Sequence, residues 1–130
     1  MNSLEYNNHP SESWAMSIGT APGYGADASN HMKEGDFAKL YLSCAEEIYE
    51  ETGVYISALI HEVRALYSPK WGCPTDGEPC YELRGTRNPQ FAEKEAYESA
   101  LIKLVSMLKD KLQQSTVYLE IQPTQMWYFK

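Results

Sequence analysis

Two stretches of the chain repeat apolar residues at the spacing of an amphipathic helix. In residues 34–53 they recur every three or four positions, with Asp36 placed to cap the start and Gly53 placed for the left-handed residue that ends a helix. In residues 87–114 Asn88 is placed to cap and Pro89 fits the first helical position. We therefore predict two helices. The apolar stripe of the second consists of Tyr97, Leu101, Leu104, Val105, Leu108 and Leu112.

Other stretches alternate apolar and polar residues, as half-buried strands do. Residues 54–67 fit either a helix or a strand, and we interpret them as a strand because Val-Tyr-Ile directly follows a helix-ending glycine. Residues 80–86 then complete a hairpin. Residues 117–122 alternate again, and Pro123 must interrupt that strand or confine it to the edge of a sheet.

The predicted order of helix, strand, strand, helix, strand indicates an α+β fold, with a small, mainly antiparallel sheet of about three strands and two helices on one face. The helical crossover would return the last strand beside the first. Residues 1–32 are rich in Asn, Ser, Gly and Ala, so we interpret them as an irregular N-terminal arm before a single α+β domain at 33–130. Trp14, Met16 and Ile18 in the arm predict that it packs on the body or on a neighbouring chain.

The charge distribution changes the functional picture. The chain of 130 residues has a net charge of −7, and all of that excess lies before Val54, since acids and bases balance after it. An acidic end would repel nucleic-acid phosphates, so we expect no direct nucleic-acid binding. The sequence also shows no signal peptide and no long apolar run, so we expect a cytoplasmic protein without a membrane segment.

The segment KWGCPTDGEPC at residues 70–80 is the main candidate for chemistry. Cys73 and Cys80 lie at the two ends of a turn, near Asp76, and with His61 they supply metal-binding or nucleophilic groups. A disulfide, a metal site and two separate thiols all fit the spacing, and we favour separate thiols, with no metal and no cofactor. A small hydrolase-like or ligand-binding enzyme using these four residues is the alternative function.

Our main interpretation is a small acidic protein-binding module, such as a phage or mobile-element accessory or inhibitor protein that acts on a basic or nucleic-acid-binding partner. No catalytic motif is present, and the surplus of tyrosines favours protein contacts and a homo-oligomer. Acids at the end of the first helix oppose the helix dipole, which suggests a docking surface. The candidate binding residues are Glu46, Glu47, Glu50, Glu51, Trp71, Trp127 and Tyr128.

Overall fold

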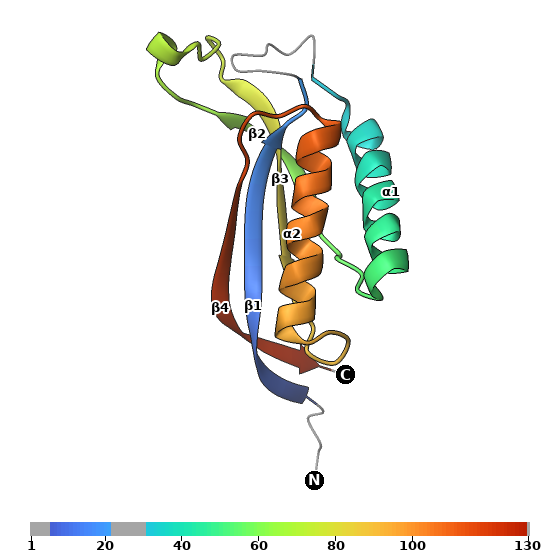
Figure 1. Ribbon diagram of the computed structural model, residues 1–130. Coiled ribbons are helices and arrows are strands. Elements are labelled where there is room, and N and C mark those ends of the chain that lie inside the picture. The colour runs from blue at the N-terminus through green and yellow to red at the C-terminus, as the bar shows by residue number, and fades with distance from the viewer. Residues whose placement is uncertain (1–5, 22–30, 130) are drawn as a thin grey trace.

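The computed structural model describes residues 6–21 and 31–129 and shows one sheet covered by two helices (Figure 1). The elements in chain order are β1 (Tyr6–Gly19), α1 (Glu34–Thr52), β2 (Leu59–Ala65), the short 3₁₀ helix η2 (Pro69–Trp71), β3 (Glu78–Thr86), α2 (Lys94–Lys111) and β4 (Tyr118–Phe129). None of the helices among these residues is long and apolar enough to cross a membrane.

The sheet is antiparallel and has four strands in the order β2-β3-β1-β4. Both helices lie on one face of it, as predicted (Figure 1). The prediction of about three strands in the order α-β-β-α-β is wrong, because it leaves out β1. The last strand consequently pairs with β1 and not with the first strand of the predicted hairpin.

The first strand overturns the interpretation of residues 1–32 as an irregular arm. Residues 6–19 form β1, which lies between β3 and β4, so the sheet already begins at residue 6. Trp14, Met16 and Ile18 are buried at alternate positions, which is the period of a strand with one covered face. Residues 1–5 and 22–30 of the predicted arm lie outside the described residues.

The first predicted helix is confirmed as α1, with one change at its start. The cap position is Lys33 and Asp36 lies inside the first turn, where a negative charge still favours the helix dipole. Gly53 has the predicted left-handed conformation, with φ 79°, and its N–H donates to the carbonyl of Tyr49.

The second predicted helix is confirmed as α2, but it begins at Lys94 and not near Asn88. Asn88 instead stabilises a turn, in which its side-chain oxygen accepts a hydrogen bond from the N–H of Gln90 at 2.9 Å. The predicted apolar stripe of α2 is buried apart from Val105, which is half-buried.

The strand interpretation of residues 54–67 holds for β2 alone, and residues 54–58 before it have no regular structure. β2 pairs with β3 as the predicted hairpin. Pro123 lies opposite Glu12 in β4, an edge strand, as its missing N–H requires.

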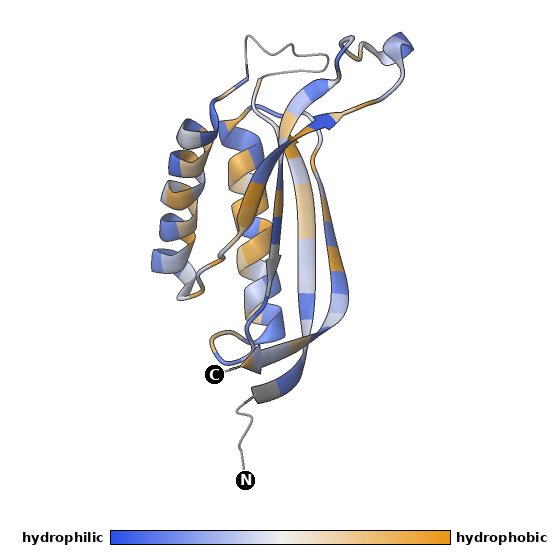
Figure 2. Cartoon of the chain, turned by 180° about the vertical axis from the view of Figure 1, so that it is seen from behind, coloured by the Kyte–Doolittle hydropathy of each residue, from blue (hydrophilic) through white to orange (hydrophobic). Residues whose placement is uncertain are grey.

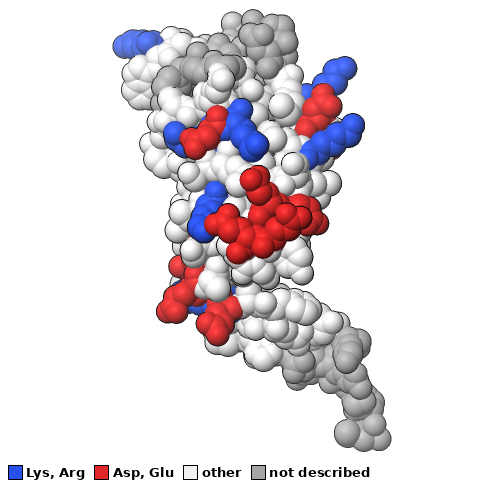
Figure 3. Space-filling view, turned by 45° about the vertical axis from the view of Figure 1, so that its right-hand side comes forward, with Lys and Arg blue, Asp and Glu red and all other residues white. Residues whose placement is uncertain are grey.

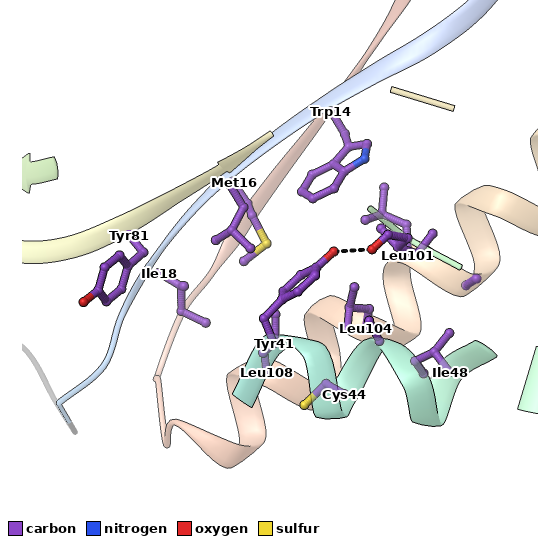
Figure 4. Close-up of a cluster of buried hydrophobic side chains, with 14 of the residues drawn as sticks. Trp14, Met16, Ile18, Tyr41, Cys44, Ile48, Tyr81, Leu101, Leu104 and Leu108 are labelled. Atoms are coloured by element: carbon purple, nitrogen blue, oxygen red, sulfur yellow. Dashed lines mark hydrogen bonds between the residues drawn. The ribbon is translucent and has the colours of Figure 1, made fainter. Parts of the chain in front are cut away.

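The core lies between the two helices and the sheet (Figure 4). Figure 2 shows the chain from behind, coloured by hydropathy, with hydrophobic and hydrophilic residues alternating along the strands. Because one face of the sheet packs against helices, the alternate residues of every strand point to the opposite, helix-free face. That face carries the site described next. The labelled core side chains in Figure 4 are Trp14, Met16, Ile18, Tyr41, Cys44, Ile48, Tyr81, Leu101, Leu104 and Leu108.

Candidate functional site

A pocket of about 500 Å³ lies on the helix-free face, where three strands meet the segment before β2. This size is in the range of small-molecule sites. Its floor is made by small side chains of β1, and its walls come from β3, β4 and residues 57–59. The lining residues are Ser13, Trp14, Ala15, Ser57, Ala58, Leu59, Arg84, Gly85, Thr86, Glu120 and Gln122.

Two opposite charges stand on either side of the pocket floor. Ala15 is directly opposite Arg84 in β3 and directly opposite Glu120 in β4, so both charged side chains flank one methyl group. Both are exposed, and neither has an ion-pair partner among residues 6–21 and 31–129. A guanidinium and a carboxylate separated by a small apolar floor can bind a ligand that itself carries both charges.

A third charged group lies one row further along the same face. Glu82 is two residues from Arg84 in β3, so the two side chains share the helix-free face. Its carboxylate accepts from Nε2 of His61 in β2 at 3.1 Å, with both side chains partly exposed. The predicted site residue His61 therefore adjoins the pocket without lining it.

Gly85 fits beneath the indole of Trp14 because it has no side chain. A Cβ at Gly85 would lie 2.6 Å from the indole nitrogen and 2.8 Å from the carbonyl oxygen of Ser57, closer than real Cβ contacts. The indole nitrogen donates to the hydroxyl of Tyr97 at 2.8 Å. Burial raises the pKa of Tyr97 and the bond from Trp14 lowers it in part, so the hydroxyl stays protonated at neutral pH.

A largely buried ion pair lies next to the pocket wall formed by Ser13 and Thr86. Nε of Arg87 donates to a carboxylate oxygen of Glu12 at 2.6 Å, and the side chains are only 10% and 14% exposed. The same guanidinium donates to the carbonyl of Ala92 at 3.0 Å. Glu12 and Arg87 directly neighbour Ser13 and Thr86, a cross-strand pair that lines the pocket, so the ion pair fixes the register at this wall.

The other residues of the predicted alternative site lie near one end of β2, away from the pocket. The thiol of Cys73 is 3.8 Å from the carbonyl oxygen of Ala65, and Cys80 is buried, which raises the pKa of its thiol. The backbone carbonyl of Asp76 accepts from Arg64. All three cysteines are free, and the described part of the chain contains no group of three His, Cys, Asp or Glu side chains that could hold a metal ion.

The predicted binding residues separate into three places. Glu46, Glu47, Glu50 and Glu51 are exposed on α1, and Figure 3 shows acidic side chains gathered on this side of the molecule. Glu51 is paired with Lys103 of α2 at 2.6 Å. Trp127 and Tyr128 lie on the edge strand β4, where the predicted homo-oligomer stays a prediction that light scattering would test. Trp71 belongs to a second pocket, which it shares with Tyr67, Thr116 and Tyr118.

Comparison with known proteins identifies the family. Residues 11–130 match the sequence model of the SAM lyases. This chain belongs to the SAM lyase family. Two solved structures share the fold at low identity. A phage SAM lyase in complex with S-methyl-5′-thioadenosine has 16% identity and a TM-score of 0.62, covering 89% of this chain and 88% of its own. A phage SAM lyase in the apo state has 15% identity and a TM-score of 0.62, covering 93% and 90%. None of the curated proteins matches the sequence.

Membership of a family of lyases overturns the interpretation of the chain as an acidic protein-binding or inhibitor module. The alternative interpretation, a small hydrolase-like or ligand-binding enzyme, agrees better with the family. The acids of α1 misled the sequence argument because an unfavourable position near a helix end was taken as evidence of function. An exposed helix face tolerates such charges at a small energetic cost.

Sequence reasoning missed the pocket residues Ser13, Arg84 and Glu120. The alternation of small residues in β1 was a readable signal, because Ser13, Ala15 and Ser17 alternate with the buried Trp14, Met16 and Ile18. A face of small side chains leaves room for a ligand. This signal indicates a site only when β1 is known to be a central strand and the residues opposite it are known.

Proposed function

We propose that the protein is a lyase that cleaves S-adenosylmethionine and leaves S-methyl-5′-thioadenosine. The family match over residues 11–130 is the observation that carries the proposal, and the pocket on the helix-free face supports it. A phage relative binds S-methyl-5′-thioadenosine, which keeps the sulfur, its methyl group and the adenosyl group. The bond to be broken is therefore the one between sulfur and the γ-carbon of the methionine part.

The chemistry of this cleavage balances without an added reactant. The electron pair of the carbon–sulfur bond goes to sulfur, so the sulfonium cation becomes a neutral thioether. A lyase adds no water, so the four-carbon fragment leaves in one of two ways. Either its own carboxylate attacks the γ-carbon and closes a lactone, or a base, either a side chain or water, takes a β-proton and a double bond forms between the β- and γ-carbons. Both routes need the substrate to be held in one conformation, which is where a binding pocket accelerates the reaction.

The charged groups of the pocket complement the methionine part of this substrate. Arg84 is suited to the carboxylate and Glu120 to the ammonium group, because the two stand on opposite sides of Ala15. The reacting bond would then lie over small side chains. A carboxylate in contact with the sulfonium would stabilise the substrate more than the transition state, since that charge disappears during the reaction. Small uncharged residues beneath the sulfur avoid this.

Product analysis tests the proposal. The purified protein is incubated with S-adenosylmethionine in ¹⁸O-water, and the products are identified by mass spectrometry at early times. We expect S-methyl-5′-thioadenosine and an unlabelled four-carbon product in equal amounts. The label would enter that product if the protein were a hydrolase, and unchanged substrate would contradict the proposed activity.

Two substitutions test the assigned pocket. Arg84→Met and Glu120→Gln should each lower kcat/KM by at least ten-fold, since each removes a charged hydrogen bond to the substrate. Glu95→Gln on the exposed surface of α2 is the control and should leave kcat/KM unchanged. If both pocket variants act like the control, the reaction takes place elsewhere on the protein.

A further inference from the structure

A second pocket, of about 450 Å³, lies where the β2–β3 connection approaches the beginning of β4. Its walls are mainly aromatic and come from Tyr67, Trp71 and Tyr118. Trp71 is 74% exposed and Tyr118 is 79% exposed, so two large aromatic faces are turned to solvent. An aromatic concavity of this size at the surface is typical of a binding site.

The loop that carries Trp71 is ordered by its own hydrogen bonds. The N–H of Trp71 donates to the carbonyl of Ser68 at 2.9 Å, and that of Gly72 donates to Pro69 at 3.0 Å. Gly72 has φ 97°, which favours glycine and ends the 3₁₀ turn. Tyr67 is fixed by its hydroxyl, which donates to Glu78 at 2.7 Å. The chain thus orders an indole that gains little burial in the folded protein, and a ligand would supply the missing contact.

The aromatic pocket adjoins the charged one along β4. Tyr118 and Glu120 are two residues apart, so their side chains share the helix-free face and lie about 7 Å apart along the strand. Glu120 lines the first pocket and Tyr118 lines the second. One ligand with a charged end and a flat aromatic end can therefore occupy both.

We propose that Trp71 and Tyr118 bind the adenine ring of the substrate and make the second pocket the site of nucleobase recognition. The inference rests on the proposed function, because adenine is the one planar aromatic group of S-adenosylmethionine. A base stacked on an aromatic side chain gains about 5- to 150-fold in affinity. Arg84 and Glu120 then hold the amino-acid end, and the ribose and sulfur lie between the two pockets.

Binding of S-methyl-5′-thioadenosine tests this assignment, because the molecule has the adenosine but no amino-acid group. Equilibrium titration of the full chain should give a Kd at least ten-fold higher for Trp71→Ala and for Tyr118→Ala than for wild type. Trp71→Phe keeps an aromatic face and should stay within about three-fold. Phe91→Ala is the matched control, since Phe91 is 80% exposed but lines neither pocket. Melting temperatures show that each variant is folded.

The kinetics separate this inference from the proposed function. With S-adenosylmethionine the Trp71→Ala variant should show a raised KM with a smaller change in kcat, since stacking holds both substrate and transition state. If wild type cleaves the substrate and folded Trp71→Ala and Tyr118→Ala both bind S-methyl-5′-thioadenosine within two-fold of wild type, the adenine assignment is wrong and the activity stands. If wild type neither cleaves the substrate nor binds that product, the proposed function and this inference are both wrong.

Discussion

The ion pair between Glu12 and Arg87 offers a quantitative test of how the pocket wall is held. Replacing Glu12 with alanine would leave a guanidinium that is only 10% exposed without its counter-charge. Removing one partner of a buried pair costs about 3–5 kcal/mol. For 130 residues, an unfolding entropy of about 2.1 cal/mol/K per residue means that each kcal/mol lowers the melting temperature by about 4 °C. We therefore expect Glu12→Ala to melt about 11–18 °C below wild type.

The chain contains a matched control for this measurement. Glu51 and Lys103 are also 2.6 Å apart, but their side chains are 54% and 48% exposed. An exposed pair contributes at most about 1 kcal/mol, so Glu51→Ala should lower the melting temperature by no more than about 4 °C. Circular dichroism at two salt concentrations measures both, and only the exposed pair should depend on salt.

A double variant distinguishes loss of the pair from loss of packing. Glu12→Leu with Arg87→Met removes both charges and should be more stable than Glu12→Ala, because no uncompensated charge stays buried. A Glu12→Ala variant that melts no lower than Glu51→Ala would contradict the role given to the buried pair. Additive effects of the two substitutions at the buried pair would contradict it as well.

Gly85→Ala should lower the melting temperature strongly or prevent folding. Gly35→Ala in the first turn of α1 is the control, since a Cβ there meets nothing within 4 Å, and it should be neutral or slightly stabilising. Thermal unfolding of both variants tests this. Replacing Cys73 and Cys80 with serine should keep the melting temperature within a few degrees, since both thiols are free, and elemental analysis should find no bound zinc. One equivalent of zinc in the wild type that is lost in the variant would contradict this. Burial, with Glu62 and other nearby acids, raises the pKa of Tyr81 to about 12, above the unfolded value of about 10. The contribution of Tyr81 to the free energy of unfolding should therefore be fully present below pH 10 and should fall as the pH rises from 10 to 12. In denaturant titrations Tyr81→Phe should lose less stability over this interval, and equal loss would contradict the assignment.

The sequence predicted those elements whose pattern is local. The apolar stripes of α1 and α2 and the hairpin of β2 and β3 were found because each repeats over a short distance. β1 was missed although Trp14, Met16 and Ile18 alternate, because the loop-like composition of residues 19–30 outweighed a short strand signal. The start of α2 was misplaced because Asn88 and Pro89 resemble a helix start but form a separate turn.

The site could not be predicted because its parts are distant in sequence. Arg84 and Glu120 belong to one site only because both lie directly opposite Ala15 in the sheet. The sequence around each of these three residues gives no indication of the other two. Cross-strand register is set by tertiary packing, and a shift of one residue would turn these side chains to the helix-covered face. The cysteine-containing turn attracted attention because reactive residue types were adjacent in sequence. The pocket instead uses common residue types whose relation appears only in the folded sheet.

The central position of β1 has a consequence for how the chain folds. Its partner residues in β3 lie 61 to 73 positions further along the chain, from Gly19 opposite Cys80 to Ser13 opposite Thr86. Those in β4 lie 101 to 123 positions further along, from Ser17 opposite Tyr118 to Tyr6 opposite Phe129. Such non-local pairing closes long loops before it gains contacts, so folding should be slow for a domain of this size. During synthesis β1 must wait for both neighbours, with its apolar face exposed until β3 and the helices are made. The sheet can be completed only when β4 has left the ribosome, so we expect partial chains to depend on chaperones until β4 pairs with β1.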